Sequence, residues 1–118
     1  MATGLPTITP RSRTTGGCCT PLVEPHLGDA HAVELAKVAK ALGDPVRLRM
    51  VDAVRQAAPE AVCQCEIKPL FDISQPAVSK HLKVLVEAGV LGVERRGTWA
   101  YYYVPQDSTM EDLEAWLS

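Results

Sequence analysis

The sequence has no long hydrophobic run, few aromatic residues and little net charge. No apolar stretch approaches the roughly 18 residues that a membrane-spanning helix needs, and the N-terminus lacks the apolar segment of a secretory signal. Only 5% of the 118 residues are aromatic and the formal net charge is −2. These absences argue against a membrane protein and against indiscriminate nucleic-acid binding, while a local basic patch stays compatible with them. We expect a cytoplasmic protein.

The size and the apolar content predict one small domain. With 47% apolar residues in 118, the chain can bury one core and is short for two. A core of this size favours stabilisation by a partner.

Cysteine is scarce but clustered. The four cysteines form two groups, Cys18-Cys19 and Cys63-Gln64-Cys65. Thiols stay reduced in the cytoplasm, and neighbouring cysteines bridge only with strain, so an easy disulfide would have to join the two groups. Residues two apart on a helix point roughly 200° apart, so Cys63 and Cys65 converge only where the backbone is extended or barely helical. The pattern favours thiolate ligands for a soft metal or metalloid.

Residues 1–28 are expected to be a flexible N-terminal tail that carries Cys18 and Cys19. This stretch holds four Gly, four Pro and six Thr without apolar periodicity, which is typical of unpacked chain. Residues 29–118 are then the folded domain.

Periodicity and capping residues predict five helices and a hairpin in that domain. Asp44-Pro45 and Ser74-Gln75-Pro76 are helix starts, whereas Gly43 and Gly89 are helix ends. The expected elements are helices over 29–42, 45–57, 61–71 and 75–88, a β-hairpin over 90–104 and a last helix from about Ser108.

The third and fourth helices with their tight turn at residues 72–74 predict a helix-turn-helix. Apolar residues of the fourth helix fall on one side, and Ser79, Lys80 and Lys83 fall on the other. A second helix with an outward polar and basic face suits the major groove of DNA.

The hairpin and the last helix suggest further contacts. Arg95-Arg96-Gly97 is the expected hairpin turn, with the alternating Trp99, Tyr101 and Tyr103 expected in the core or an interface. The last helix carries an apolar stripe that is too exposed for so short a segment, so we expect it to pack against another subunit. Its members are Met110, Leu113, Trp116 and Leu117.

Three ordered motifs resemble the ArsR/SmtB family. They are Ala41-Leu42-Gly43-Asp44-Pro45-Val46-Arg47-Leu48-Arg49, Ser74-Gln75-Pro76-Ala77-Val78-Ser79-Lys80-His81-Leu82, and the Arg95-Arg96-Gly97 wing, within residues 32–104. The resemblance implies a mainly α fold with a β-hairpin wing (α+β), the homodimeric winged helix-turn-helix. It also implies a repressor that leaves its operator when an inducer binds.

The resemblance extends to the inducer site. Val62-Cys63-Gln64-Cys65-Glu66-Ile67 is similar to the cysteine box of arsenite, cadmium and lead sensors, but Lys68 stands where one arsenite-sensing subgroup has a third cysteine. A third thiolate must then come from Cys18 or Cys19. We expect As(III) or Sb(III) on three sulfurs, with Cd(II), Pb(II) or Zn(II) as the alternative. The family's other site, on the last helix, is not expected, because Glu111, Asp112 and Glu114 have no neighbouring His.

The implied DNA contacts come from the second helix of the helix-turn-helix and from the wing. Gln75, Ser79 and Lys80 are expected to read bases or backbone, and His81 to pack, to contact a phosphate or to contact a base. Phosphate contacts are expected from Ser74, Lys83, Arg95 and Arg96. A two-fold dimer would place its recognition helices about 34 Å apart, which requires inverted half-sites in double-stranded operator DNA.

Three other functions use the same residues. A disulfide between the cysteine clusters would make a thiol redox switch, and inert cysteines would leave a constitutive DNA-binding protein. A metallochaperone or thiol enzyme is disfavoured, because the sequence has no Cys-x-x-Cys and no His and acid arranged as catalytic partners. We therefore expect no enzyme and no small organic substrate.

Overall fold

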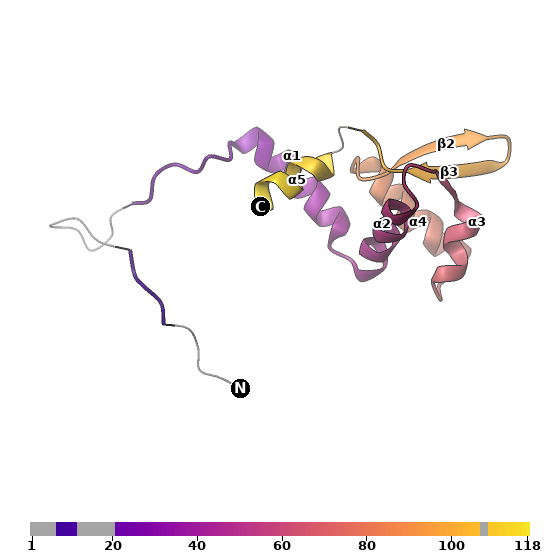
Figure 1. Cartoon of the computed structure of the whole chain (residues 1–118), viewed down its shortest axis with the longest axis horizontal. Coiled ribbons are helices and arrows are strands. Elements are labelled where there is room, and N and C mark those ends of the chain that lie inside the picture. Colours follow the sequence, from indigo (N-terminus) through magenta and orange to yellow (C-terminus); the bar gives the residue numbers. More distant parts are fainter. Residues whose placement is uncertain (1–6, 12–20, 107–108) are drawn as a thin grey trace.

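The computed structural model describes residues 7–11, 21–106 and 109–118. Five α-helices, one 3₁₀ turn and three short strands follow one another along this part of the chain (Figure 1). Their order is α1 (Asp29–Leu42), α2 (Pro45–Ala57), β1 (Val62–Cys63), α3 (Gln64–Ile67), a 3₁₀ turn (Lys68–Leu70), α4 (Gln75–Glu87), β2 (Gly92–Arg96), β3 (Trp99–Tyr103) and α5 (Thr109–Leu117).

The first two helices confirm the predicted boundaries. Helix α1 ends before Gly43, and α2 begins at Pro45 behind the cap Asp44. The Asp44 carboxylate accepts hydrogen bonds from the backbone N–H groups of Val46 at 2.9 Å and Arg47 at 3.1 Å. Two of the unpaired donors at the helix start are thereby satisfied, which fixes where α2 begins.

The prediction of one helix over residues 61–71 is wrong for its first part. Val62 and Cys63 form β1, which pairs antiparallel with Tyr102 and Tyr101 of β3. The backbone is therefore extended at Cys63 (φ −72°, ψ 146°), and helix α3 starts only at Gln64. Pro69 lacks an N–H for the helical ladder, and the segment tightens into the 3₁₀ turn at Lys68–Leu70.

Strand β3 lies between β1 and β2 in a three-stranded antiparallel sheet. The hairpin pairs Arg96 with Trp99, so Arg95 and Arg96 belong to β2 and the turn consists of Gly97 and Thr98. Gly97 has φ +64°, a left-handed conformation that glycine adopts without strain. The expected turn at Arg95-Arg96-Gly97 is thus displaced by about one residue.

The alternation along β3 is the reverse of the one expected for the core. Ala100 and Tyr102 are the buried residues of this strand, whereas Trp99 is 54% exposed and Tyr101 and Tyr103 are half-buried. Tyr102 lies between Val62 of β1 and Val93 of β2 in the sheet register. The expectation that Trp99, Tyr101 and Tyr103 lie in the core or an interface is therefore wrong for the core and stays a prediction for an interface.

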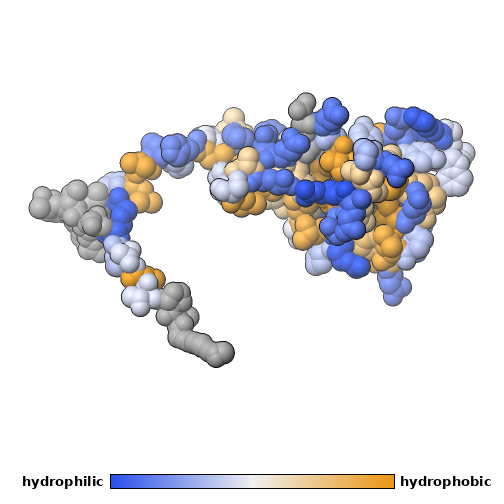
Figure 2. Space-filling model, in the orientation of Figure 1, coloured by the Kyte–Doolittle hydropathy of each residue, from blue (hydrophilic) through white to orange (hydrophobic). Residues whose placement is uncertain are grey.

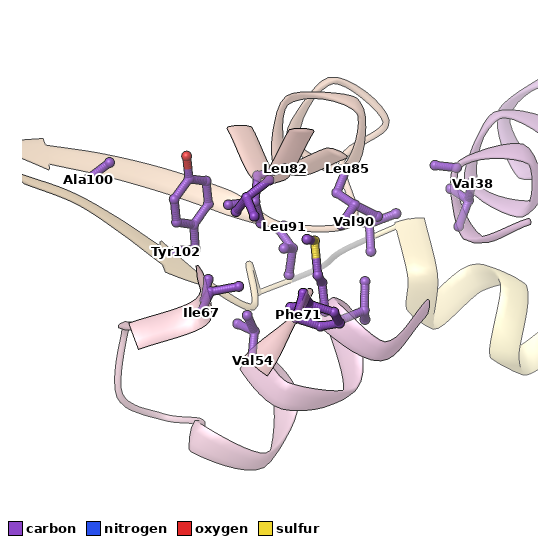
Figure 3. Close-up of a cluster of buried hydrophobic side chains, with 14 of the residues drawn as sticks. Val38, Val54, Ile67, Phe71, Leu82, Leu85, Val90, Leu91, Ala100 and Tyr102 are labelled. Carbon is purple, nitrogen blue, oxygen red and sulfur yellow. The ribbon is translucent and has the colours of Figure 1, made fainter. Parts of the chain in front are cut away.

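One hydrophobic core joins the helices to the sheet. The most deeply buried side chains come from α1, α2, α3, α4 and the segment between α4 and β2, as Figure 3 shows. Those that are almost wholly buried are Val38, Met50, Val51, Val54, Ile67, Val78, Leu82, Leu85, Val90 and Leu91. The ring of Tyr102 lies at the edge of this cluster, with its hydroxyl pointing away from it (Figure 3).

Helix α5 packs against α1 of its own chain (Figure 1). Leu113 is buried there, and Arg55 of α2 forms an ion pair with Glu114 at 3.0 Å. Trp116 and Leu117 remain exposed. No helix among the described residues is both long and apolar enough to cross a membrane.

The arrangement is a winged helix-turn-helix. Helix α3 and its 3₁₀ turn lead through residues 71–74 into α4, and the β2–β3 hairpin projects beside them as the wing (Figure 1). The surface of the wing end is mainly hydrophilic in Figure 2. The expected fold class is thus confirmed.

Candidate DNA interface and cysteine site

Helix α4 presents a polar face because its sequence puts its three buried apolar residues on the opposite side. Ser74 caps the helix by accepting a hydrogen bond from the Ala77 N–H at 3.3 Å. Val78, Leu82 and Leu85 are fully buried. The exposed residues include most of the predicted DNA contacts, namely Gln75, Ser79, Lys80 and Lys83.

His81 lies differently from the other predicted contacts. Its ring is half-buried, and Nδ1 is 3.3 Å from an N–H of the Arg47 guanidinium, whose Nε donates to the Ala41 carbonyl at 2.6 Å. Because an arginine can only donate, Nδ1 is the acceptor in this contact. His81 therefore joins α4 to the α1–α2 corner.

The wing places its two arginines in different surroundings. Arg95 lines a hollow of about 580 Å³ together with Ser79, Lys83, Gln64 and Tyr102. Arg96 lines a separate hollow with Tyr101 and Tyr103 and forms an ion pair with Glu94. Arg95 thus shares a cavity with predicted contacts of α4.

The Cys63-Gln64-Cys65 segment spans the end of strand β1 and the start of helix α3. Cys63 is the N-cap of α3, and its sulfur accepts a hydrogen bond from the Cys65 N–H at 3.3 Å. In return, the Glu66 carboxylate accepts from the Cys63 N–H at 2.9 Å, which completes a capping box. The extended backbone at Cys63 is the condition under which two cysteines in this spacing can approach one another.

The two thiols differ in exposure. Cys63 is buried and Cys65 is exposed, and both are free. The side-chain hydrogen bond with Cys63, followed by desolvation and by the charges of Cys63 and Glu66, raises the pKa of the Cys65 thiol. Cys65 is therefore a protonated thiol at neutral pH.

Both thiols lie beside the elements that are predicted to face DNA. Cys63 and Cys65 line a hollow of about 260 Å³ with Gln75 from the start of α4 and with Arg95 and Trp99 from the wing. A ligand bound to these sulfurs would occupy the space between the helix and the wing.

Cys18 and Cys19 lie outside the described residues. Within the part of the chain that the structure describes, no three His, Cys, Asp or Glu side chains gather as potential metal ligands. The described residues therefore supply at most the Cys63 and Cys65 thiols, and a third sulfur would have to come from elsewhere.

Gln64 is the residue of this region that the sequence did not single out. Its amide Nε2 donates to the Ser79 hydroxyl at 2.7 Å, and its Oε1 accepts from the Tyr102 hydroxyl at 3.2 Å. These partners are 15 and 38 residues away in the chain. No local pattern signals such a contact, and only the Cys-x-Cys context draws attention to the position.

Comparison with known proteins agrees with this architecture. A family model described as "Bacterial regulatory protein, arsR family" matches residues 44–92. The arsenic resistance transcriptional regulator ArsR1 of Pseudomonas putida is 42% identical over 91 residues, which cover 69% of this chain and 70% of that protein. The chain belongs to the ArsR family.

One further relative supports the assignment to the ArsR family, and one solved structure supports the fold. The arsenical resistance operon repressor of Bacillus subtilis is 36% identical, covering 67% of this chain and 70% of that protein. A homodimeric winged helix-turn-helix domain from Mycobacterium bovis matches the fold with a TM-score of 0.61 and 23% identity, covering 81% of this chain and 82% of that chain. The family match includes Cys63, Cys65 and α4, whereas Cys18 and Cys19 lie before it.

Proposed function

We propose that this ArsR-family protein represses transcription as a homodimer and leaves its operator when As(III) or Sb(III) binds its cysteine thiols. The observation that carries the proposal is the shared hollow, in which Cys63 and Cys65 lie beside Gln75 of α4 and Arg95 of the wing. Relatives named as arsenical resistance repressors support the choice of inducer.

The DNA-binding surface consists of the exposed face of α4 and the wing. Gln75, Ser79 and Lys80 enter the major groove, where they contact base edges or the backbone. Phosphate contacts come from Ser74, Lys83, Arg95 and Arg96, with His81 supporting α4 through Arg47. Two such surfaces related by a two-fold axis bind inverted half-sites about 34 Å apart.

Exposed apolar side chains on α1 and α5 support the dimer. Val33, Trp116 and Leu117 are 55%, 57% and 67% exposed, although α5 is already docked on α1 through Leu113. Covering such side chains on the two helices removes apolar surface from water. The dimer contact therefore extends the intramolecular α1–α5 packing.

The inducer site combines the two cysteine clusters. Arsenous acid exchanges its three hydroxyl groups for three thiol sulfurs, and each exchange forms one As–S bond and releases one water, so protonated thiols are suitable partners. Cys63 and Cys65 supply two sulfurs and Cys18 or Cys19 supplies the third. Binding ties the N-terminal tail to α3 and changes the position of α4 relative to the wing.

An operator-release assay tests the proposal. Labelled promoter DNA is saturated with reduced protein, and arsenite, antimonite, cadmium, lead and zinc are added in separate titrations while fluorescence anisotropy is recorded. Release by arsenite or antimonite at low concentration supports the proposal. Release by cadmium, lead or zinc alone would instead assign a divalent-metal sensor, and release by diamide alone would assign a redox switch.

Cysteine variants test the shared site, with a gain-of-function control. Cys63→Ser and Cys65→Ser should each abolish release by arsenite, and so should the double variant Cys18→Ser/Cys19→Ser. Adding Lys68→Cys to that double variant supplies a thiol one helical turn beyond Cys65 and should restore the response. A normal response from all the serine variants would contradict the cysteine site.

A further inference from the structure

Gln64 occupies the one position between the two cysteines and contacts the DNA-facing side of α4. Its amide forms the Nε2–Ser79 Oγ hydrogen bond at 2.7 Å and the Oε1–Tyr102 hydroxyl hydrogen bond at 3.2 Å. Ser79 is exposed, Tyr102 is buried, and both line the 580 Å³ hollow with Lys83 and Arg95. The Gln64 side chain thus joins the cysteine segment, the core and the predicted DNA surface.

The Tyr102 hydroxyl sets the donor and acceptor roles in both hydrogen bonds of the Gln64 amide. Burial raises the pKa of the Tyr102 phenol, so its hydroxyl stays protonated and donates to the Gln64 carbonyl oxygen. The amide is thereby oriented with its N–H₂ group toward the Ser79 oxygen. One lone pair of the Ser79 hydroxyl is occupied, and its proton remains available to a DNA acceptor.

The backbone that carries Gln64 depends on a cysteine sulfur. Cys63 Sγ accepts the Cys65 N–H at 3.3 Å across Gln64, and this cap helps to hold the first turn of α3. Arsenic or antimony bound to this sulfur would replace the small thiol proton by a much larger atom beside the N–H that the sulfur accepts. We therefore expect a change at Cys63 or Cys65 to move Gln64, which lies between them.

We propose that Gln64 is the positioning residue that couples the cysteine site to the DNA surface. In the inducer-free protein, the Tyr102–Gln64–Ser79 chain of hydrogen bonds holds the Ser79 hydroxyl as a donor toward the operator. Inducer binding at the flanking thiols withdraws the Gln64 amide and releases Ser79. This inference rests on the proposed function for the identity of the inducer and of the DNA surface.

A double-mutant cycle without inducer tests the first half of this coupling. Gln64→Met keeps the length of the side chain and removes both hydrogen bonds, and Ser79→Ala removes the receiving hydroxyl. Each single variant should weaken operator binding about fivefold, the effect of one hydrogen bond. The double variant should be no weaker than Ser79→Ala alone, because the two residues act through the same contact.

Two further variants separate coupling from general damage to the fold. Tyr102→Phe keeps the buried ring and removes only the hydroxyl that orients the amide, so it should also weaken operator binding in the parent but not in Ser79→Ala. Gln56→Met is the matched control, because Gln56 is an exposed glutamine that bonds within α2, to Asp52 at 2.9 Å. It should leave operator affinity unchanged. Additive losses in the Gln64→Met/Ser79→Ala protein would overturn the proposal.

Arsenite titrations test the second half of the coupling, in which inducer binding releases Ser79. In the parent, arsenite should lower operator affinity by a measurable factor. In Gln64→Met that factor should shrink by about fivefold, because only the inducer-free affinity depends on the hydrogen bonds. An unchanged factor would overturn the coupling role. Failure of arsenite to affect the parent would instead refute the proposed function, and the cycle without inducer would then still decide the Gln64–Ser79 link.

Discussion

The sulfur of Cys63 accepts a hydrogen bond from the backbone N–H of Cys65 at 3.3 Å. The atom that caps helix α3 is thus the same atom that we propose as an inducer ligand. These two roles can be separated by substitution, since serine caps helices well and alanine does not.

Cys63→Ser should keep the fold and operator binding but lose the response to arsenite. Cys63→Ala should lose the response as well and be less stable than the serine variant by about 1 kcal/mol, the usual value of an N-cap. Thermal unfolding and operator anisotropy measure the two effects. Equal stability of the serine and alanine variants would show that the sulfur does not act as a cap.

Two consecutive residues of α4 should behave in opposite ways. Leu82 is fully buried, so Leu82→Ala should cost about 2–5 kcal/mol of unfolding free energy. The adjacent Lys83 is exposed, so Lys83→Ala should change stability by less than about 0.5 kcal/mol. Urea unfolding of the two variants measures both changes, and similar values would contradict the assigned faces of α4.

DNA binding by the Lys83→Ala protein should nevertheless weaken. The slope of log affinity against log salt should also fall by about one for each phosphate that the lysine no longer neutralises. Fluorescence anisotropy over a range of salt concentrations gives this slope. An unchanged salt slope would show that Lys83 does not contact a DNA phosphate.

Acid should destabilise the protein partly through Asp44. The hydrogen bond from the Arg47 N–H is the largest cause that lowers the pKa of this carboxyl below its ordinary value. A lowered pKa in the folded state means that the unfolded state binds the proton more readily. The contribution to stability is therefore complete above the ordinary pKa and is lost as the pH falls through the folded value.

Asp44→Asn should accordingly show a smaller fall in the urea midpoint between about pH 5 and pH 3 than the parent. Asp52→Asn is the matched control, because Asp52 is an exposed carboxylate on the same helix. It should retain the pH dependence of the parent. The expectation fails if Asp44→Asn and Asp52→Asn follow the same curve.

The wing turn depends on the left-handed backbone of Gly97. A Cβ at this position would meet no atom within 4 Å, so the cost of a side chain is conformational, with φ at +64°. Gly97→Ala should lose about 1 kcal/mol of stability, whereas Gly97→Asn should lose less because asparagine tolerates this conformation better. Thermal unfolding of the two variants tests the order, and equal losses would contradict it.

The helices were predictable because their caps and apolar spacing are local signals. Asp44 before Pro45 and Ser74 before Gln75 mark the starts of α2 and α4, and the structure confirms both. Strand β1 was not predictable, because Val62 and Cys63 are extended through pairing with Tyr102 and Tyr101, which lie far along the chain. A two-residue strand has no periodicity of its own.

The buried face of β3 was ambiguous for another reason. Every residue from Trp99 to Tyr103 except Ala100 is aromatic, so alternation alone cannot tell the inner face from the outer one. Packing between Val62 and Val93 decides that Tyr102 points inward. The Gln64–Ser79 contact requires Tyr102 to point inward, because the Tyr102 hydroxyl orients the Gln64 amide. This contact could therefore not be predicted from the sequence.

The central claim is that inducer binding and operator binding oppose one another. It is tested most directly by measuring the affinity of arsenite for the reduced protein by calorimetry, first free and then saturated with operator DNA. We predict that DNA weakens arsenite binding by the same factor by which arsenite weakens DNA binding, within roughly 5- to 150-fold. Equal arsenite affinity in the free and the DNA-bound protein would contradict the claim.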